Sequence, residues 1–325
     1  MSPELRGTRL TALGTYVPER VITNAELSRL VDTNDEWIVR RTGIRERRAT
    51  RDDEFTSDMC TAAARGLDLD GVDFVILSTT TPDYAFPSVA SQVQDRLGIV
   101  GAGAIDINAT CAGFAYGLHV AHGLVASGVQ QKVLVLSGET LTKVTDYTER
   151  TTCILFGDGA GAALVEPSDR PTVHATIVGS DGSGGGLLYR TGLSTRIAAP
   201  GDTKRDVIRQ NGREVYKWAV ETVSAGVCEL LRRGNLTPDA VDWFVPHSAN
   251  FRITEAVSER VGIPVERTLS SIEYFGNTSA ATIPLALMLG QRDGKLREGD
   301  TVLLYGFGGG LVHAGILLEW RPDSR

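Results

Sequence analysis

The chain has 325 residues, 42% hydrophobic and 22% charged, which is enough to bury a sizeable core as two domains or one large double domain. Its formal net charge of -7 argues against general nucleic-acid binding, which requires a basic surface. No apolar run approaches the roughly 20 residues that span a bilayer, and the start lacks a secretory signal, so we expect no membrane association. The four cysteines form no Cys-x-x-Cys pair, which argues against a zinc ribbon or disulfide framework and favours the cytoplasm.

Short apolar segments alternate with longer amphipathic ones along the first half of the chain. Residues 72–80, 104–108 and 132–139 are predicted to be strands, and residues 88–99 and 112–128 are predicted to be helices. Alternation of this kind predicts an α/β fold with a parallel sheet covered by helices on both faces.

The second half repeats this pattern weakly. The segment AVDWFVPHS at 240–248 resembles GVDFVILS at 71–78, with Asp242 in the place of Asp73. The later strand DTVLLYGFGGG at 300–310 likewise resembles the strand KVLVLSGE of the first half. The sequence therefore predicts two related α/β halves.

We place the boundary between these halves near residue 170, in the turn-rich segment EPSDRP, which gives domains of residues 1–170 and 171–325. The glycine-rich segment 180–186 is expected to be a flexible surface loop and not a domain linker.

Four features follow predicted strands or lie in the turns after them: Cys111, His247, Asn277 and the segment GFGGG at 306–310. Ligands of open α/β sheets bind beyond the carboxyl ends of the strands. Two related halves would therefore bring these features around one cavity.

Cys111 lies between a polar lead-in and a small, apolar, helix-like segment. If the helix begins at Ala112, the thiol lies at its N-terminus, where the helix dipole and unpaired N–H groups favour the thiolate. A thiolate attacks thioesters, and small neighbours such as Ala112 and Gly113 would leave room for one. The alternative is a buried cysteine that acts as a small hydrophobe, which is our interpretation of the other three cysteines.

His247 is either a proton donor or acceptor in a cleft or a structural histidine. Asn277 is by default a turn residue, and otherwise a neutral donor that stabilises an oxyanion. If a malonyl thioester lost carbon dioxide here, neutral donors would suit the resulting enolate, because a carboxylate would repel the malonyl group. No Asp or Glu is prominent in these motifs.

Other motifs have less specific interpretations. FGDGAGAALV at 156–165 precedes a predicted strand, whereas a dinucleotide-binding loop opens a helix, so a bend beside packed backbone is favoured. The glycines at 306–310 lack the Lys-Ser/Thr of a phosphate-binding loop, and their N–H groups could instead line an oxyanion hole. His119 and His122 have no evident third ligand, so no metal site is predicted.

Basic residues cluster twice. One cluster follows Trp37, and the other repeats every four residues and would share one helix face. Each cluster is either a solvated surface or a site for an anion such as a CoA phosphate or an acidic carrier protein. The members are Arg40, Arg41, Arg45, Arg47 and Arg48 in the first cluster, and Arg209, Arg213 and Lys217 in the second.

Together these motifs resemble the 3-oxoacyl-acyl carrier protein (ACP) synthase III family, the initiating condensing enzymes of fatty-acid synthesis. The similar segments extend over nearly the whole chain: residues 23–48, 85–88, 109–118, 150–163, 245–253, 276–281 and 306–310. The resemblance implies a thiolase-type fold with two βαβαβ halves in α-β-α-β-α layers, and a homodimer.

The resemblance also implies the reaction. A short acyl-CoA primer would condense with malonyl-ACP, with loss of carbon dioxide, to give 3-oxoacyl-ACP and CoA. Cys111 would carry the primer, His247 and Asn277 would assist decarboxylation, and the N–H groups of Cys111 and Gly309 would form the oxyanion hole. Both thioesters are substrates, so no cofactor is implied.

Binding residues follow from matching positions. CoA would contact Trp37, Arg41, Arg150, Arg213 and Asn250. The carrier protein would contact Lys217, Ser248, Ala249, Asn250, Phe251 and Arg252. The acyl pocket would be lined by Phe307 and, across the dimer, by Phe86. Ser248 and His313 depart from the family pattern, which leaves the choice of primer open.

Several alternatives use the same scaffold. An acyltransferase or a condensing enzyme of secondary metabolism is the nearest. A biosynthetic thiolase would carry a second cysteine near the C-terminal glycines, and an elongating synthase would carry a histidine at Asn277. A non-catalytic partner subunit would lack the nucleophile, and Cys111 is present.

Overall fold

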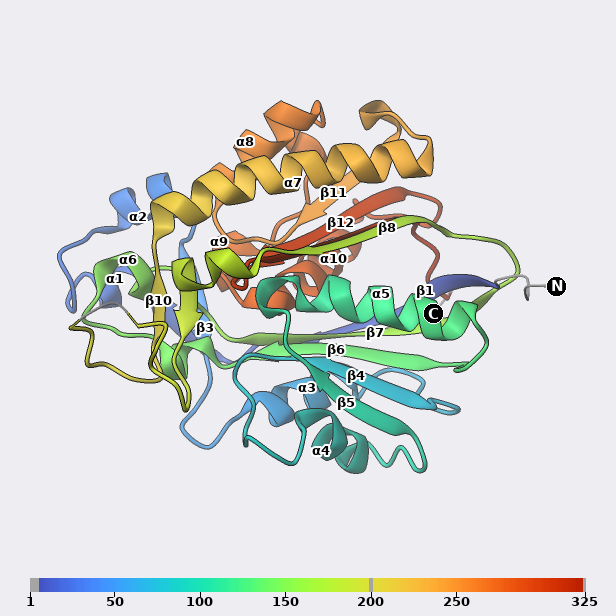
Figure 1. The fold of residues 1–325 in the computed structure, drawn as a ribbon, viewed down its shortest axis with the longest axis horizontal. Helices are drawn as coiled ribbons and strands as arrows, with labels where there is room; N and C mark the ends of the chain where they lie inside the picture. The colour runs from blue at the N-terminus through green and yellow to red at the C-terminus, as the bar shows by residue number, and fades with distance from the viewer. Residues whose placement is uncertain (1–5, 199–200, 324–325) are drawn as a thin grey trace.

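The computed structural model describes residues 6–198 and 201–323. Two sheets lie parallel to one another, with two helices between them and further helices on each outer face (Figure 1). This arrangement confirms the α-β-α-β-α layering. One sheet has the strand order β1-β7-β6-β4-β5, and the other has the order β11-β12-β13-β8.

The strands of the first sheet are β1 (Gly7–Tyr16), β4 (Phe74–Ser78), β5 (Gly103–Ile107), β6 (Val133–Glu139) and β7 (Gly159–Ser168). Those of the second are β8 (Val173–Ser180), β11 (Trp243–Pro246), β12 (Thr301–Gly308) and β13 (Val312–Glu319). The chain thus changes sheet between Ser168 and Val173. That the two halves are separate domains stays a prediction.

Long helices form the other three layers. The central pair is α5 (Gly113–Ala126) and α10 (Thr282–Arg292); α3 (Thr56–Ala64) and α4 (Val89–Arg96) cover the first sheet, and α7 (Gly212–Gly234) and α8 (Phe251–Val261) cover the second. The predicted elements of the first half are therefore confirmed, with boundaries shifted by a few residues.

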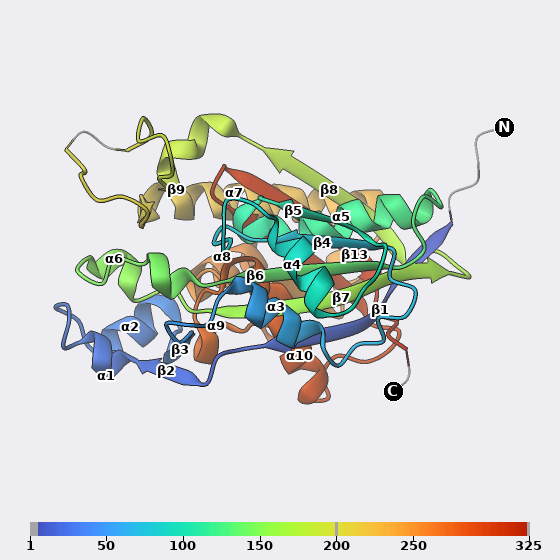
Figure 2. The same cartoon turned by 90° about the horizontal axis from the view of Figure 1, so that it is seen from below.

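Smaller elements gather at one end of the molecule, away from both termini (Figure 2). They are α1 (Asn24–Leu27), α2 (Asp35–Thr42), α6 (Arg150–Cys153), α9 (Ile272–Phe275), β2 (Arg20–Thr23), β3 (Glu46–Ala49), β9 (Leu188–Arg190) and β10 (Ile208–Gln210). Short 3₁₀ turns occupy Thr110–Ala112, Leu141–Val144, Gly182–Leu187, Pro238–Ala240, Val265–Arg267 and Ser279–Ala281.

The predicted repeat between the two halves is visible in the hydrogen bonds. Asp73 precedes β4 and accepts bonds from the N–H groups of Gln131 (2.7 Å) and Lys132 (3.1 Å), just before the parallel strand β6. Asp242 precedes β11 and accepts a bond from the N–H of Thr301, at 2.8 Å, where the parallel strand β12 begins. The two aspartates thus fix the same strand pair in each half.

Both sheets contain antiparallel as well as parallel pairs, whereas the sequence predicted a parallel sheet. β4 pairs in parallel with β5 and β6, but β7 runs antiparallel to β6 and β13 runs antiparallel to β12. The link between β12 and β13 is only the turn 309–311, and a parallel pair requires a much longer crossover.

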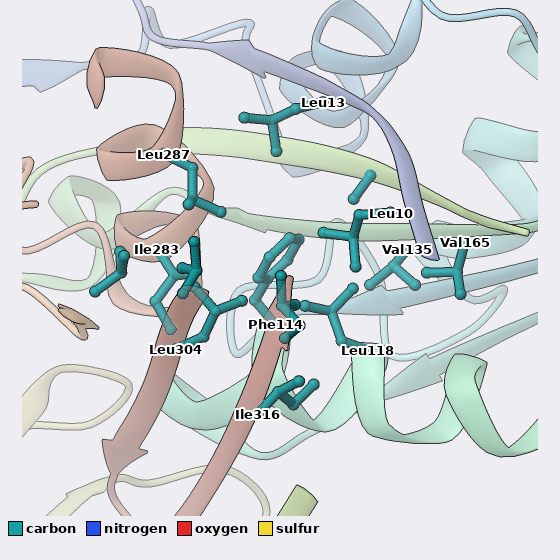
Figure 3. Close-up of a cluster of buried hydrophobic side chains, with 14 of the residues drawn as sticks. Leu10, Leu13, Phe114, Leu118, Val135, Val165, Ile283, Leu287, Leu304 and Ile316 are labelled. Atoms are coloured by element: carbon teal, nitrogen blue, oxygen red, sulfur yellow. The ribbon is translucent and has the colours of Figure 1, made fainter. Parts of the chain in front are cut away.

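Most residues of the central helices are buried, because each helix lies between the two sheets. Phe114 and Leu118 of α5 meet Ile283 and Leu287 of α10 in the middle of the molecule (Figure 3). Strand side chains close this core from both sides: Leu10, Leu13, Val135 and Val165 from one sheet, and Leu304 and Ile316 from the other.

A search of the helices in residues 6–198 and 201–323 finds none with the length and apolar character of a membrane-spanning segment.

Two sequence expectations about loops and charges are wrong. The segment 180–186 is not a free loop: paired backbone bonds join Asp181 and Leu311 (2.7 and 2.8 Å), and Gly184 packs against Leu311. Arg209 lies on β10, outside the helix that carries Arg213 and Lys217, and its guanidinium pairs with Asp202.

Arg47 is likewise neither on the surface nor available to an anion. It is fully buried, and its guanidinium donates to the Asn24 Oδ1 at 2.6 Å and to the Ile154 carbonyl. Burial lowers the pKa of Arg47 to about 10, so the group stays charged near neutral pH. The two bonds of the Arg47 guanidinium join β3 to α1 and to the end of α6.

Phe114→Ala is expected to lower the free energy of unfolding by about 3–5 kcal/mol, because Phe114 is fully buried between the sheets and a cavity would remain. Chemical denaturation with Val129→Ala as a control measures this, since Val129 is 67% exposed. Equal unfolding midpoints for the two variants would contradict this account of the core.

Candidate active site

A cavity of about 990 Å³ lies at the ends of the strands, beside the small peripheral elements, and residues of both halves line it. Most of the residues that the sequence singled out meet here: Trp37, Arg41, Cys111, Arg150, Arg213, His247, Ala249, Asn250, Arg252, Asn277, Phe307 and Gly309. The expectation that features at strand ends share one cavity is therefore confirmed.

Cys111 lies in the 3₁₀ turn Thr110–Ala112, between the end of β5 and the start of α5. Thr110 adopts a left-handed conformation (φ 44°), which turns the chain sharply before the helix. The Thr110 hydroxyl donates to the Gly309 carbonyl at 2.8 Å, which joins this turn to the glycine segment of the other half.

The glycines after the second sheet have a packing function that the sequence did not reveal. β12 extends through Gly306 and Phe307 to Gly308. A Cβ atom at position 308 would lie 2.9 Å from the Cys111 Cβ and 3.0 Å from the Cys111 N. Glycine is thus required for β12 to approach the Cys111 turn.

The small residues after Cys111 do not leave room for a substrate, contrary to expectation. Ala112 is fully buried in a cluster with Ala115 and Ala314. A Cβ at Gly113 would collide with the Ser78 hydroxyl. Their size lets α5 pack closely between the two sheets.

His247 follows β11 and is 2% exposed. Its backbone N–H donates to the Tyr305 carbonyl at 2.8 Å, and its Nδ1 lies 2.7 Å from the Thr282 hydroxyl. The Phe307 ring meets the imidazole edge-on, with 5.2 Å between the ring centroids. Burial lowers the pKa of His247 to about 3, so the imidazole is neutral at physiological pH.

Asn277 is fixed by its backbone. Its N–H donates to the Leu155 carbonyl (2.9 Å), and its carbonyl accepts from the Gly157 N–H (3.1 Å). The Asn277 Oδ1 accepts from the Ser279 N–H at 2.8 Å, which leaves the Nδ2 of the amide as the free, donating end.

The turns that carry Cys111 and Asn277 are equivalent in the two halves. Asn108 accepts from the Thr110 N–H (3.4 Å) just as Asn277 accepts from the Ser279 N–H, and Ser279 is also left-handed (φ 53°). Each turn leads into a central helix, and Ala280 occupies the place of Cys111. The sequence signal is the shared pattern Asn-x-Thr/Ser-x-Ala in NATCA and NTSAA, which the repeat analysis missed.

Sequence reasoning also missed Glu139, a fully buried carboxylate at the end of β6. It accepts bonds from the Thr80 N–H (3.0 Å) and hydroxyl (2.8 Å), the Thr81 hydroxyl (2.9 Å) and the Ser279 hydroxyl (3.3 Å). Burial raises the pKa of Glu139 to about 7, against the effect of these donors. The local motif SGE at 137–139 does not predict these hydrogen bonds, because their donors come from distant segments of the chain.

Burial dominates the electrostatics of Cys111 as well. It raises the pKa of the thiol to about 12, while a hydrogen bond from the Ser279 side chain acts in the opposite direction and Glu139 adds to the rise. The unliganded site therefore holds a thiol at neutral pH, contrary to the expected thiolate at a helix N-terminus.

The mouth of the cavity is basic. The Arg150 guanidinium lies 5.1 Å from the centre of the Trp37 ring. Arg41, Arg190, Arg213 and Arg252 also line the cavity, are exposed, and make no ion pair with another described residue. No Asp or Glu lines the cavity among the described residues. Arg190 is an addition to the predicted set.

Four residues predicted to contact the carrier protein or the acyl chain lie away from the cavity: Phe86, Lys217, Ser248 and Phe251. Lys217 is exposed on α7, and Phe251 is partly buried at the start of α8. Ser248 is 2% exposed and accepts a bond from the Ser271 N–H at 3.1 Å, so its side chain is not placed for a carrier contact. Phe86 is 86% exposed, and its place across a dimer stays a prediction. His313 bonds to the Tyr305 hydroxyl at 2.9 Å, so neither departure from the family pattern lines the cavity.

Comparisons with known proteins show the family of this chain. Two family models of 3-oxoacyl-ACP synthase III match residues 105–182 and, for the C-terminal part, residues 231–320. A Halalkalibacterium halodurans protein named β-ketoacyl-ACP synthase III 2 is 55% identical, with 97% of each chain covered. The chain belongs to the 3-oxoacyl-ACP synthase III family.

Other synthase III relatives are similar over the same length. A Bacillus subtilis protein named β-ketoacyl-ACP synthase III 2 is 52% identical, over 96% of this chain and 98% of the relative. The crystal structure of the Thermus thermophilus β-ketoacyl-ACP synthase III is 45% identical with a TM-score of 0.91, over 96% of this chain and 99% of that one. A priming β-ketosynthase of the R1128 polyketide pathway is 38% identical with a TM-score of 0.92, over 99% of both chains.

Alkylation of Cys111 by iodoacetamide is expected to accelerate about tenfold per pH unit between about pH 7 and 10, because burial raises the thiol pKa to about 12 and only the thiolate reacts. Peptide mass spectrometry measures the rate, with Cys111→Ala as the control for alkylation of the exposed Cys228. A rate that reached its plateau near neutral pH would contradict this electrostatic account.

Proposed function

We propose that this protein condenses a short acyl-CoA primer with malonyl-ACP to give 3-oxoacyl-ACP, carbon dioxide and CoA, the first condensation of fatty-acid synthesis. The observation that carries the proposal is the convergence of Cys111, His247 and Asn277 on one cavity that has an arginine-rich mouth. The names of the relatives, β-ketoacyl-ACP synthase III, support it.

The first half-reaction loads the primer. The Cys111 sulfur attacks the acyl-CoA carbonyl, a new S–C bond forms, the S–C bond to CoA breaks, and the thiol proton leaves with the CoA sulfur. The N–H groups of Cys111 and Gly309 would hold the carbonyl oxygen as it becomes negative. The approach of the glycine segment to the Cys111 turn supports this assignment.

The second half-reaction forms the carbon–carbon bond. Malonyl-ACP loses carbon dioxide, and the electron pair left behind forms an enolate whose carbon attacks the acyl carbonyl on Cys111. A carbon–carbon bond forms, the bond between the acyl carbon and the Cys111 sulfur breaks, and the released thiolate takes up a proton from water. Asn277 would donate from Nδ2 to the enolate oxygen, and the His247 imidazole, whose Nδ1 lies 2.7 Å from the Thr282 hydroxyl, would assist from its Nε2 side. Both groups are neutral, and no carboxylate among the described residues lines the cavity to repel the malonyl group.

The mouth of the cavity suits two anionic partners. Trp37 and Arg150 would offer a stacking surface for the adenine of CoA, and Arg41, Arg213 and Asn250, which line the same cavity, would contact its phosphates. Arg252, with Ala249 and Phe251 beside it and Lys217 on α7, would meet the acidic carrier protein. The apolar wall holds the acyl chain and consists of Leu141, Leu155, Phe156, Leu188, Ile208 and Phe307.

The proposed enzyme is a cytoplasmic homodimer that needs no cofactor. The free cysteines Cys60, Cys111, Cys153 and Cys228 are typical of a reducing compartment, which supports the location. Two exposed features support the dimer: Phe86, and the edge strand β5 with Ile105 40% exposed. The priming ketosynthase of a polyketide pathway keeps polyketide initiation open as a second function for the same chemistry.

The test is mass spectrometry of the carrier protein after incubation with malonyl-ACP and a mixture of acyl-CoA esters. A 3-oxoacyl-ACP is expected, and its mass identifies the primer. If Cys111 became acylated but no carbon–carbon product formed, the protein would be an acyltransferase and the proposed condensation would be wrong.

Single substitutions should separate the half-reactions. Cys111→Ala should abolish covalent acylation by acyl-CoA. Asn277→Ala should leave acylation intact and slow malonyl-ACP decarboxylation about 100-fold, since one donor to the enolate oxygen is lost. Intact-protein mass and released carbon dioxide measure the two steps. Acylation of the Cys111→Ala protein would show that the nucleophile lies elsewhere.

A further inference from the structure

Thr282 begins the central helix α10 and contacts two groups of the candidate site. It is fully buried, and its hydroxyl oxygen lies 2.7 Å from the His247 Nδ1 and 2.9 Å from the Ser279 carbonyl oxygen. Neither the predicted catalytic set nor the predicted binding set includes Thr282. Its two contacts bear on which nitrogen of the neutral His247 ring carries the proton.

The Ser279 carbonyl can only accept a hydrogen bond, so the Thr282 hydroxyl is the donor in the contact of 2.9 Å. A hydroxyl has one proton, and this proton is then not available to His247. The Thr282 oxygen can still accept a second bond, and its neighbour at 2.7 Å is the His247 Nδ1. Both contacts are therefore hydrogen bonds only if Nδ1 carries the ring proton.

The other protonation states of the ring fit these contacts less well. If Nε2 alone carried the proton, the Thr282 hydroxyl would have to donate to Nδ1, and two oxygens without a proton between them would face each other at 2.9 Å. A buried polar contact without its hydrogen bond is destabilising. A doubly protonated ring is disfavoured as well, because burial lowers the pKa of His247 to about 3.

The repeat between the two halves provides a comparison for this contact. Ser78 occupies the place of His247 in the repeated strand segments, and Gly113 occupies the place of Thr282 in the repeated turns. These two positions also meet in the first half, since a Cβ at Gly113 would collide with the Ser78 hydroxyl, which has no hydrogen-bond partner. Close packing at the start of a central helix therefore does not require a hydroxyl, and the hydroxyl of Thr282 serves the imidazole of the second half.

We propose that Thr282 is a positioning residue that fixes neutral His247 with its proton on Nδ1, so that Nε2 offers a lone pair to the cavity. His247 lines the cavity, and Thr282 already occupies its Nδ1. Toward a bound malonyl thioester, neutral His247 is then an acceptor, and the Asn277 Nδ2 is the neutral donor to the enolate oxygen. This division of roles rests on the proposed function, whereas the position of the ring proton does not.

Nitrogen NMR of protein labelled with ¹⁵N-histidine measures the proton position directly, because protonated and unprotonated ring nitrogens have well-separated chemical shifts. His247→Asn identifies the His247 signals by their loss from those of the five histidines. In the unsubstituted protein at neutral pH, a protonated Nδ1 and an unprotonated Nε2 are expected. A protonated Nε2 would overturn the proposal.

Thr282→Val and Thr282→Ser test whether the hydroxyl is the cause. Valine has nearly the shape of threonine but cannot accept from Nδ1, whereas water in the cavity can accept from a proton on Nε2. The balance should therefore shift toward the ring protonated on Nε2. Serine keeps the hydroxyl, so the proton should stay on Nδ1. An unchanged balance in Thr282→Val, or an equal shift in Thr282→Ser, would show that another group fixes the ring.

Thr61→Val is the matched control. Thr61 is 5% exposed on α3, its hydroxyl donates to the Ser57 carbonyl of the same helix at 2.7 Å, and it lies outside the cavity. This variant loses a comparable bond, and the His247 signals should not move; a shift equal to that of Thr282→Val would overturn the proposal. The measurement needs neither acyl-CoA nor malonyl-ACP, so a protein that fails to condense these substrates and a ring proton on Nε2 are separate results.

Discussion

The close approach of β12 to the Cys111 turn is the constraint on which the site depends. Gly306 and Gly308 face this turn, and a Cβ at position 306 would lie 2.7 Å from the Ala112 Cα. With side chains there, the second sheet would move away from the nucleophile, and the bond between Thr110 and the Gly309 carbonyl would be lost. A cavity shared by both halves exists because glycine allows the two backbones to touch.

Duplication explains how one scaffold supplies both a nucleophile and neutral donors. The two equivalent turns have the same Asn-to-N–H bond and the same left-handed residue, yet one presents the Cys111 thiol and the other presents the Asn277 amide. The charges are separated in the same way: arginines line the mouth of the cavity, and Glu139, a buried acidic group beside the nucleophile, accepts bonds from hydroxyl and N–H donors. The arginines at the mouth would attract an anionic thioester, and no carboxylate among the described residues lining the cavity would repel it.

Periodicity predicted the strands and helices of the first half, because it is a property of neighbouring positions, whereas the resemblance to the synthase III family implied the layers and most of the binding residues in the cavity. The sequence did not predict contacts made by distant segments. Glu139 accepts bonds from threonines of another loop, Gly308 packs against the distant Cys111 turn, and Ser248 is buried and accepts a bond from the Ser271 N–H. The thiolate expected at Cys111 failed for the same reason, since burial is a property of the folded chain and outweighs the local helix dipole.

The most direct measurement is a chase of the acylated protein. The protein is loaded with labelled acyl-CoA, freed of excess ester, and mixed with malonyl-ACP. The account predicts that the label lies on Cys111 and not on Cys60, Cys153 or Cys228, and that it then moves to the carrier protein as 3-oxoacyl-ACP with release of carbon dioxide. A label on another residue, or one that leaves Cys111 only as free acid, would contradict the account.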